Sequence, residues 1–225
     1  MCAAASRAES LPRWLRFGYV LWFVPWSIVY WSYFGWQFWL WFCCLANLYV
    51  FLGCVTQRAL WFSLAAVAAL GVQLIYTVDF LTLCFTRVSL TGATSYLLDI
   101  TRPLSVRVLS LFHVWMPWLV LYATRRLGYD ARAFWIQTLA CACLLPICYF
   151  AFDPRLDTND PVMPTVQGLP FDRDFNINWV HAFYDRPEPA ARGRRLWELM
   201  LGYPIAVHLP THLLLSWRHA TRPKA

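Results

Sequence analysis

The chain has 225 residues, of which 60% are hydrophobic and only 14% are charged, against roughly 45–50% and 25% in soluble globular proteins. The stretch from Phe17 to Gln57 contains no Asp, Glu, Lys or Arg, and no soluble domain of this size has a core that could hide it. Composition therefore excludes a soluble enzyme, a disordered segment and a nucleic-acid binder. The net charge of +7 is to be explained by membrane topology before any partner is considered.

Six apolar segments have the length of a membrane-spanning helix, which needs about 20 residues at 1.5 Å rise each. Gly35 separates the first from the second, and Gln57-Arg58 separates the second from the third. We expect spans over residues 17–34, 36–55, 59–80, 104–123, 133–152 and 196–217. The predicted fold is all-α, a polytopic membrane helix bundle that forms a single membrane domain over residues 1–225, with the lipid bilayer as its main partner.

Basic residues predict the orientation of this bundle. Arg7, Arg13 and Arg16 precede the first apolar segment, which lacks a small-residue cleavage site and is expected to stay as an anchor. With the N-terminus in the cytoplasm, the short segments 1–16, 56–58, 124–132 and 218–225 are denser in Arg and Lys than 81–103 and 153–195. The positive-inside rule then predicts a cytoplasmic membrane protein with both termini inside, although three arginines after residue 191 oppose this orientation.

The polar segment 153–195 is the one long connection and is expected to fold as an extracytoplasmic cap over the helix ends. Within it, Asp172, Asp174, Asn176 and Asn178 place oxygen side chains at every second position, as at the start of an EF-hand loop. Ile177 occupies the position that an EF-hand gives to glycine, which excludes that motif. Asn176 and Asn178 remain candidates for a looser cation or sugar site, or for an Asx-turn.

Ionisable groups inside lipid are candidate functional residues because their burial is costly. Asp79 ends the third predicted span and Arg107 begins the fourth, at the same predicted depth. An ion pair between them would join the two helices. Alternatively, Arg107 would bind an anionic headgroup or substrate, with Asp79 as a further polar contact.

Three histidines fall within predicted spans. His208 and His212 are four residues apart, so both rings lie on one helix face, as helical metal ligands require. His113 is predicted at a similar depth on the fourth span, and Asp130 could serve as a catalytic or carboxylate partner. This pattern predicts a zinc site with an open position for water. The alternative is that each histidine hydrogen-bonds a neighbouring helix.

The eight cysteines lie almost wholly in apolar segments and form no CxxC pair. Buried, unreactive thiols are therefore expected. Cys84, beside Arg87 at the end of an apolar segment, is the one cysteine that this pattern marks as a candidate for reactivity.

Four short motifs resemble those of a group of uncharacterised bacterial multi-pass integral membrane proteins. They are SLFH at 110–113, LGYD at 127–130, NINWV at 176–180 and PTH at 210–212. The resemblance runs from about Asp79 to the C-terminus and implies a multi-pass membrane protein without assigning an activity. A fainter likeness is to membrane hydrolases of the alkaline ceramidase and adiponectin-receptor type, which implies zinc held by His113, His208 and His212.

Two classes of function follow. One is an intramembrane enzyme, a metal-assisted hydrolase or transferase acting on a lipid substrate. The other is a carrier or solute-binding protein whose polar residues Asp79, Arg107, Asn176 and Asn178 hold a polar solute. A structural subunit of a membrane complex is equally compatible with the composition.

Overall fold

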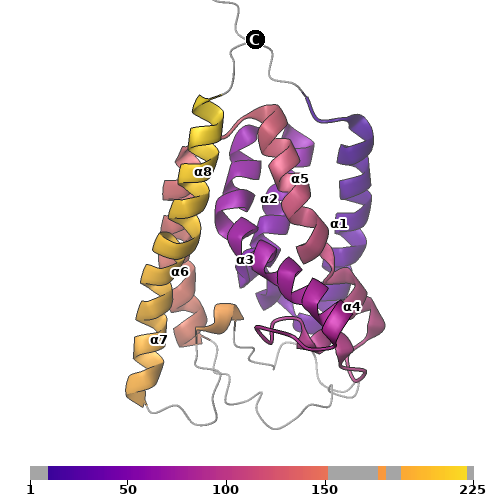
Figure 1. The fold of residues 1–225 in the computed structure, drawn as a ribbon, viewed down its shortest axis with the longest axis vertical. Coiled ribbons are helices and arrows are strands. Elements are labelled where there is room, and N and C mark those ends of the chain that lie inside the picture. The colour runs from indigo at the N-terminus through magenta and orange to yellow at the C-terminus, as the bar shows by residue number, and fades with distance from the viewer. Residues whose placement is uncertain (1–9, 152–176, 181–188, 222–225) are drawn as a thin grey trace, which may run out of the picture.

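The computed structural model describes residues 10–151, 177–180 and 189–221, and this part of the chain contains helices and no strand. Long helices run side by side along the longest axis of the molecule (Figure 1). The elements in chain order are α1 (Arg13–Phe34), η1 (Trp36–Leu40), α2 (Phe42–Thr56), α3 (Ala59–Thr86), η2 (Ser95–Leu98), α4 (Leu104–Leu109), α5 (Phe112–Leu127), α6 (Arg132–Ala151), η5 (Ile177–Trp179), α7 (Pro189–Gly202), η6 (Tyr203–His208) and α8 (Leu209–Ala220). The all-α prediction is confirmed for the described residues, while most of the predicted cap at 153–195 lies outside them.

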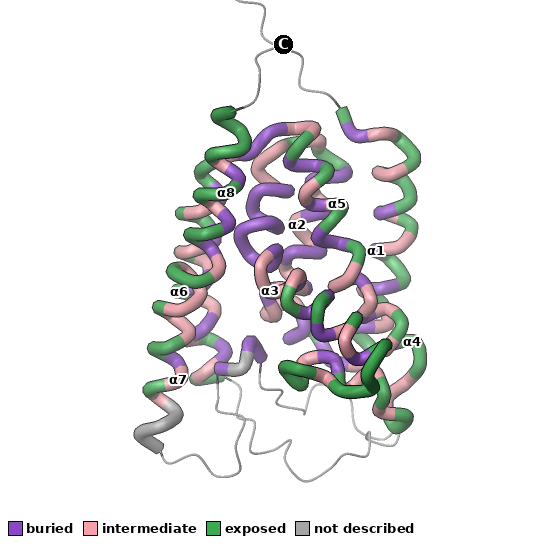
Figure 2. The backbone as a smooth tube through the Cα atoms, viewed as in Figure 1, coloured by how far each residue is buried: buried purple, intermediate pink, exposed green. Residues whose placement is uncertain are grey.

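Helix α3 forms the centre of the bundle. It packs against α2, α5 and α6, and every residue from Phe62 to Leu70 is buried. Four of these nine positions are alanines. Small side chains let neighbouring helices pack closely, and in lipid this packing replaces the hydrophobic effect as the force that holds helices together. The purple core of Figure 2 follows this arrangement, and green positions lie on the outer faces of the surrounding helices.

Four helical stretches are long and apolar enough to cross a membrane: Ala59–Thr86, Leu104–Leu127, Arg132–Ala151 and Gly193–Ala220. They correspond to the predicted spans at 59–80, 104–123, 133–152 and 196–217, which supports a multi-pass membrane protein. α2, with 15 residues, is short for a span. α1 has 22 residues but is rich in Trp and Tyr, whose polar atoms lower its hydropathy.

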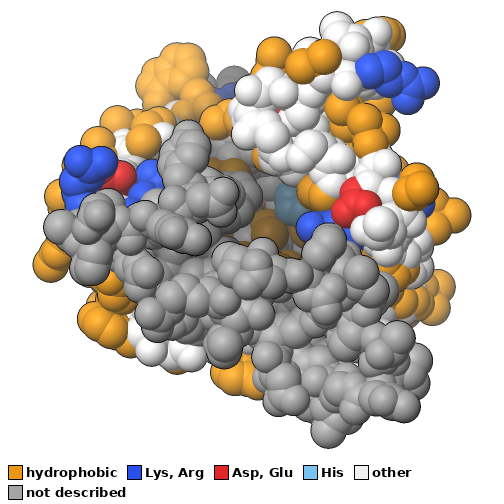
Figure 3. Space-filling model, turned by 90° about the horizontal axis from the view of Figure 1, so that it is seen from below, with side chains coloured by type: hydrophobic (Ala, Val, Ile, Leu, Met, Phe, Trp, Pro, Cys, Tyr) orange, Lys and Arg blue, Asp and Glu red, His pale blue; other side chains and the backbone are white. Residues whose placement is uncertain are grey.

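The outer surface of the bundle is apolar. Leu21, Phe150 and Trp135 are 74%, 80% and 72% exposed, and hydrophobic side chains also ring the molecule when it is viewed from the end shown in Figure 3. Soluble monomers rarely expose contiguous apolar surface on this scale. Lipid contact accounts for it.

Two predicted boundaries need correction. The segment 36–55 is not one helix, because Trp41 is extended and separates η1 from α2. The last span begins earlier than 196 and contains a π-helical turn, η6, in which the Leu209 amide donates to the Pro204 carbonyl. Pro210 lacks an N–H and crowds the carbonyl four residues before it. A wider turn just upstream absorbs that strain without ending the helix.

Both ends of the described chain lie at the same end of the bundle, together with the connection between α5 and α6 (Figure 1). We call this the terminal end. The opposite end, at which α3 ends and α4 begins, we call the loop end.

Candidate functional site

A cluster of polar side chains lies at the loop end, where α2 begins, α3 ends and α5 begins. Its centre is Cys43, the second residue of α2, whose thiol lies near the His113 ring and 4.0 Å from the sulfur of Cys44. His113 is the second residue of α5. Both residues are partly exposed, so a substrate can approach the pair from one side. Figure 3 views this end and shows a histidine side chain at the floor of a hollow.

The orientation of the His113 ring is fixed by its surroundings. Nδ1 lies 2.8 Å from the carbonyl oxygen of Ser110, and because a carbonyl only accepts, Nδ1 must carry the proton. The ring also stacks on Tyr76, with centroids 4.5 Å apart. Nε2 is therefore the ring nitrogen that can accept a proton from the Cys43 thiol. A nucleophile, a base and a group that orients the base are thus present together.

Hydroxyl groups surround this pair. The Tyr76 and Tyr96 hydroxyls are 2.7 Å apart, and the Ser110 hydroxyl, which donates to the Val106 carbonyl, lies 2.7 Å from that of Tyr30. Burial raises the pKa of Tyr96 above its ordinary value of 10.0, so this phenol stays neutral and able to donate. We name Cys43, Tyr76, Tyr96, Ser110 and His113 the Cys43–His113 cluster.

Arg107 lies at the same end, in α4. One of its terminal nitrogens donates to the Leu97 carbonyl at 3.2 Å, next to Tyr96 of the cluster. Its Nε is buried without a hydrogen-bond partner among the described residues. An unpartnered guanidinium nitrogen is a donor that a carboxylate or phosphate can use.

The predicted ion pair between Asp79 and Arg107 is wrong. The Asp79 carboxylate accepts four hydrogen bonds from neutral donors. These are the hydroxyls of Ser89 and Thr94 and the backbone amides of Thr91 and Thr94. The loop after α3 folds back over the carboxylate and supplies these donors, so Asp79, which is 1% exposed, anchors a loop.

The structure does not bring His113, His208 and His212 together. Nδ1 of His208 lies 3.2 Å from the Thr138 hydroxyl, and Nδ1 of His212 lies 2.9 Å from the Tyr129 hydroxyl. Among the described residues, no three His, Cys, Asp or Glu side chains form a group that could hold a metal ion. His208, in η6, therefore contacts α6, and His212, in α8, contacts the α5–α6 connection. Helix α3 packs against α5 and also against η6 and α8.

Asp130 does not contact a histidine either. Its carboxylate accepts hydrogen bonds from the Arg132 guanidinium at 2.7 to 3.2 Å, and these bonds hold the pKa of Asp130 below its ordinary value of 3.8. The contact from this connection to His212 comes from the preceding residue, Tyr129. The structure therefore gives Asp130 no partner suited to proton transfer.

Asn178 is buried, with 5% of its surface exposed, beside the junction of η1 and α2. Its amide oxygen accepts from the Phe42 backbone N–H at 3.0 Å, and its amide nitrogen donates to the Leu40 carbonyl at 2.7 Å. These two backbone groups flank the break between η1 and α2. Asn178 is therefore occupied by the backbone, while Asn176 lies outside the described residues.

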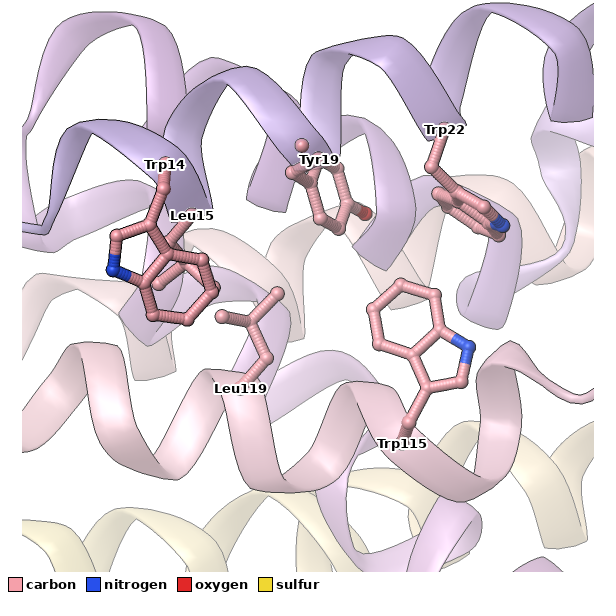
Figure 4. Close-up of a pocket in the computed structure, with 7 residues that line it drawn as sticks. Trp14, Leu15, Tyr19, Trp22, Trp115 and Leu119 are labelled. Carbon is pink, nitrogen blue, oxygen red and sulfur yellow. The ribbon is translucent and has the colours of Figure 1, made fainter.

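A groove of about 280 Å³ lies between α1 and α5. It is lined by Trp14, Leu15, Gly18, Tyr19, Trp22, Trp115 and Leu119, and Figure 4 shows the aromatic rings and leucines of both helices turned toward it. The one hydroxyl among these residues belongs to Tyr19 and donates to Asn47 at 2.8 Å. The groove offers apolar contact and no reactive group.

Sequence reasoning missed Cys43. Nothing in the spacing of a cysteine and a histidine 70 positions apart predicts contact, because the approach of α2 to α5 is made by tertiary packing around α3. Cys84, the cysteine that the sequence pattern marks as a candidate for reactivity, is exposed and forms no disulfide. Comparison with protein-family models, with curated proteins and with solved structures finds no match for this chain.

Proposed function

We propose that this chain is a six-span membrane protein whose Cys43–His113 pair transfers or hydrolyses an acyl group carried by a membrane-borne substrate. The observation that carries the proposal is the closeness of the Cys43 thiol to the His113 ring, whose Nδ1–H donates to the Ser110 carbonyl. Cys43 is the nucleophile, His113 is the base and the Ser110 carbonyl orients the base, which is the arrangement of an activated thiol. No metal enters this chemistry, so the histidine contributes as a base.

The reaction has two steps. Nε2 of His113 takes the thiol proton, the Cys43 sulfur attacks the acyl carbonyl carbon, and the bond to the leaving oxygen breaks as that oxygen receives the proton from His113. The acyl group is then a thioester on Cys43. Water or another hydroxyl attacks this thioester with His113 again acting as base, which releases the acyl product and restores the thiol.

Location and charge favour a lipid-like substrate with an anionic group. The cluster lies in the half of the apolar bundle nearer the loop end, with His113 the tenth residue of the candidate span Leu104–Leu127. The guanidinium of Arg107, whose buried Nε has no partner among the described residues, adds a cation in the same region that suits a phosphate or carboxylate. The Tyr96 hydroxyl is a neutral donor that could stabilise an oxyanion at the carbonyl.

The proposal includes α1 and α2 as the remaining two spans. Both termini of the described chain lie at one end (Figure 1), which requires an even number of crossings. The lipid-facing side of α1 is apolar, with Trp14 73% and Phe17 67% exposed. The density of arginine at the terminal end supports a cytoplasmic location for that end.

Thiol reactivity tests the assignment without knowledge of the substrate. Purified protein in detergent is treated with iodoacetamide at pH 7, and each cysteine is followed by peptide mass spectrometry. We expect Cys43 to react at least about tenfold faster than the more exposed Cys84, because only a thiol with a neighbouring base is activated. His113→Gln should remove that difference, whereas His219→Gln should leave it unchanged.

Incubation with a p-nitrophenyl acyl ester should give a burst of nitrophenol and an acyl mass on the Cys43 peptide. Cys43→Ser should abolish the adduct. A Cys43 that reacts no faster than Cys84 and that is insensitive to His113→Gln would contradict the proposal.

A further inference from the structure

A second pocket lies at the terminal end, between the last turns of α5 and α8. Its volume is about 370 Å³, and it is distinct from the Cys43–His113 cluster at the other end of the bundle. The residues that line it are Leu121, Thr124, Arg125, Tyr129, Leu215, Trp217, Arg218, His219 and Thr221. Leu121 and Leu215 make its inner wall apolar, and the charged side chains belong to the last turns of the two helices.

The charge of this lining has one sign. Arg125 and Arg218 contribute two permanent cations, and His219 adds a ring nitrogen donor. No Asp or Glu lines the pocket, and within the described chain neither arginine is paired with a carboxylate. Two unpaired guanidinium groups at one small pocket form a site for an anion.

The hydroxyl groups of the lining residues already have hydrogen-bond partners. The Thr124 hydroxyl donates to the Val120 carbonyl at 2.9 Å, the Thr221 hydroxyl donates to the Trp217 carbonyl at 3.0 Å, and the Tyr129 hydroxyl bonds His212. The donors left for a ligand are therefore those of Arg125, Arg218 and His219, together with the indole N–H of Trp217. The ligand must accept hydrogen bonds and carry negative charge.

The position favours a group at the membrane surface. Trp217 is 64% exposed beside the pocket, and indole rings are enriched at the level of lipid headgroups. Leu215 on the inner wall is buried, whereas Arg125, Arg218 and His219 are exposed. Basic pockets between membrane helices of this kind hold anionic lipid headgroups.

We propose that this pocket is a phosphate site, bound through Arg125 and Arg218, whose ligand is the phosphate of an anionic phospholipid headgroup or a free phosphate. Both guanidinium groups donate to phosphate oxygens, and His219, whose ring covers Gly128 at 3.2 Å from the position of a Cβ there, closes the pocket on one side. The site is independent of the acyl-transfer proposal.

Thermal unfolding and native mass spectrometry in detergent test this site. Phosphatidylglycerol is titrated into wild type and into Arg125→Gln/Arg218→Gln, with phosphatidylcholine in parallel. At about 1 kcal/mol per arginine near an anionic surface, the double substitution should weaken phosphatidylglycerol binding about 30-fold. Arg58→Gln, which removes an exposed arginine at the same end of the bundle, should change binding little.

Inorganic phosphate and glycerol 3-phosphate distinguish the two sources. Binding of phosphatidylglycerol alone identifies a lipid site, and comparable binding of inorganic phosphate identifies a free-phosphate site. If the arginines only complement the negative ends of the α5 and α8 dipoles, the double variant would lose stability equally with and without phosphatidylglycerol. That result, or equal binding by wild type and the double variant, would overturn the proposal.

Discussion

At the scale of single residues, a polar side chain in this bundle is held in place by the backbone groups that it satisfies. In lipid an unpaired backbone N–H or carbonyl costs several kcal/mol, so a side chain that pairs one is strongly constrained. Asp79 and Asn178 both do this, and neither has capacity left for a ligand. Among the described residues, the buried groups without a hydrogen-bond partner include Arg107 Nε, His208 Nε2 and the side-chain amide of Gln137. Of these, Arg107 lies beside the Cys43–His113 cluster, where we place the proposed chemistry.

Asn178 gives the first test at this scale. Asn178→Ala leaves the Phe42 N–H and the Leu40 carbonyl without partners, and one unsatisfied buried group costs about 1–3 kcal/mol. The residue also has a positive φ of 53°, which alanine tolerates poorly. Asn178→Gly keeps that conformation and removes only the side chain. Thermal unfolding in detergent should therefore rank wild type above Asn178→Gly and Asn178→Gly above Asn178→Ala, and equal stability of all three would contradict the assigned role.

Asp130 predicts an acid-dependent loss of stability. Hydrogen bonds from Arg132 lower its pKa in the folded state, so its contribution is present above the unfolded-state pKa of about 4 and is lost as pH falls through the lower folded-state pKa. The melting temperature of wild type should drop more steeply than that of Asp130→Asn between about pH 5 and pH 3. Parallel curves for the two proteins would show that the pair contributes nothing measurable.

The histidines show why residues could be identified from the sequence while their grouping could not. Burial of His208 and the helical face shared with His212 follow from local spacing. Their distance from His113 depends on which helices are neighbours, and α3 stands between. The contact of His212 with Tyr129 joins the PTH and LGYD motifs, yet nothing in either motif encodes that pairing. The resemblance to bacterial multi-pass proteins stays a prediction.

At the scale of elements, helix ends were predictable where the chain needs an unusual backbone. Gly35 has a φ of 76° and ends α1, and Gln57 is left-handed and ends α2. The break at Trp41 was not predictable, because its unpaired groups are satisfied by Asn178, 136 positions away from Phe42. Long-range partners of this kind leave no local signal.

The contact of α2 with α3 makes a prediction for these elements. A Cβ at Gly53 would lie 2.6 Å from a ring carbon of Phe62, and Phe62 is fully buried. Gly53→Ala should therefore destabilise the bundle by about 1–3 kcal/mol through overpacking. Combining it with Phe62→Leu should cost less than the sum of the two single changes.

Gly18→Ala is the matched control for that comparison. No atom lies within 4 Å of a Cβ at Gly18, and alanine favours a helix over glycine by about 1 kcal/mol. The control should be neutral or stabilising in the same unfolding assay. A Gly53→Ala protein as stable as Gly18→Ala would mean that α2 and α3 are not packed as described.

At the scale of the whole molecule, the orientation in the membrane is a prediction from the sequence, and the structure shows which arginines share one end of the bundle. Arg58, Arg125, Arg126 and Arg218 all belong to segments at the terminal end, and two of them, Arg125 and Arg126, lie in the last turn of α5, just before the short α5–α6 connection. Short loops obey the positive-inside rule better than long ones. The three arginines after residue 191 begin the last helix at the opposite end and weigh less because a long segment precedes them.

Accessibility labelling tests this orientation in full. In a variant whose native cysteines are replaced by alanine, single cysteines are placed at Ile100, Ala131 and Ala220, all exposed. Ile100 lies between α3 and α4 at the loop end, and the other two lie at the terminal end (Figure 1). In intact spheroplasts a membrane-impermeant maleimide should label Ile100→Cys, and it should label Ala131→Cys and Ala220→Cys only after the membrane is permeabilised. Labelling of Ala220→Cys on the same side as Ile100→Cys would require an even number of crossings between these two positions, where the six-span bundle has three, and would refute that bundle. Exchange of the two sides would keep six spans and show that the arginines before α8 decide the orientation.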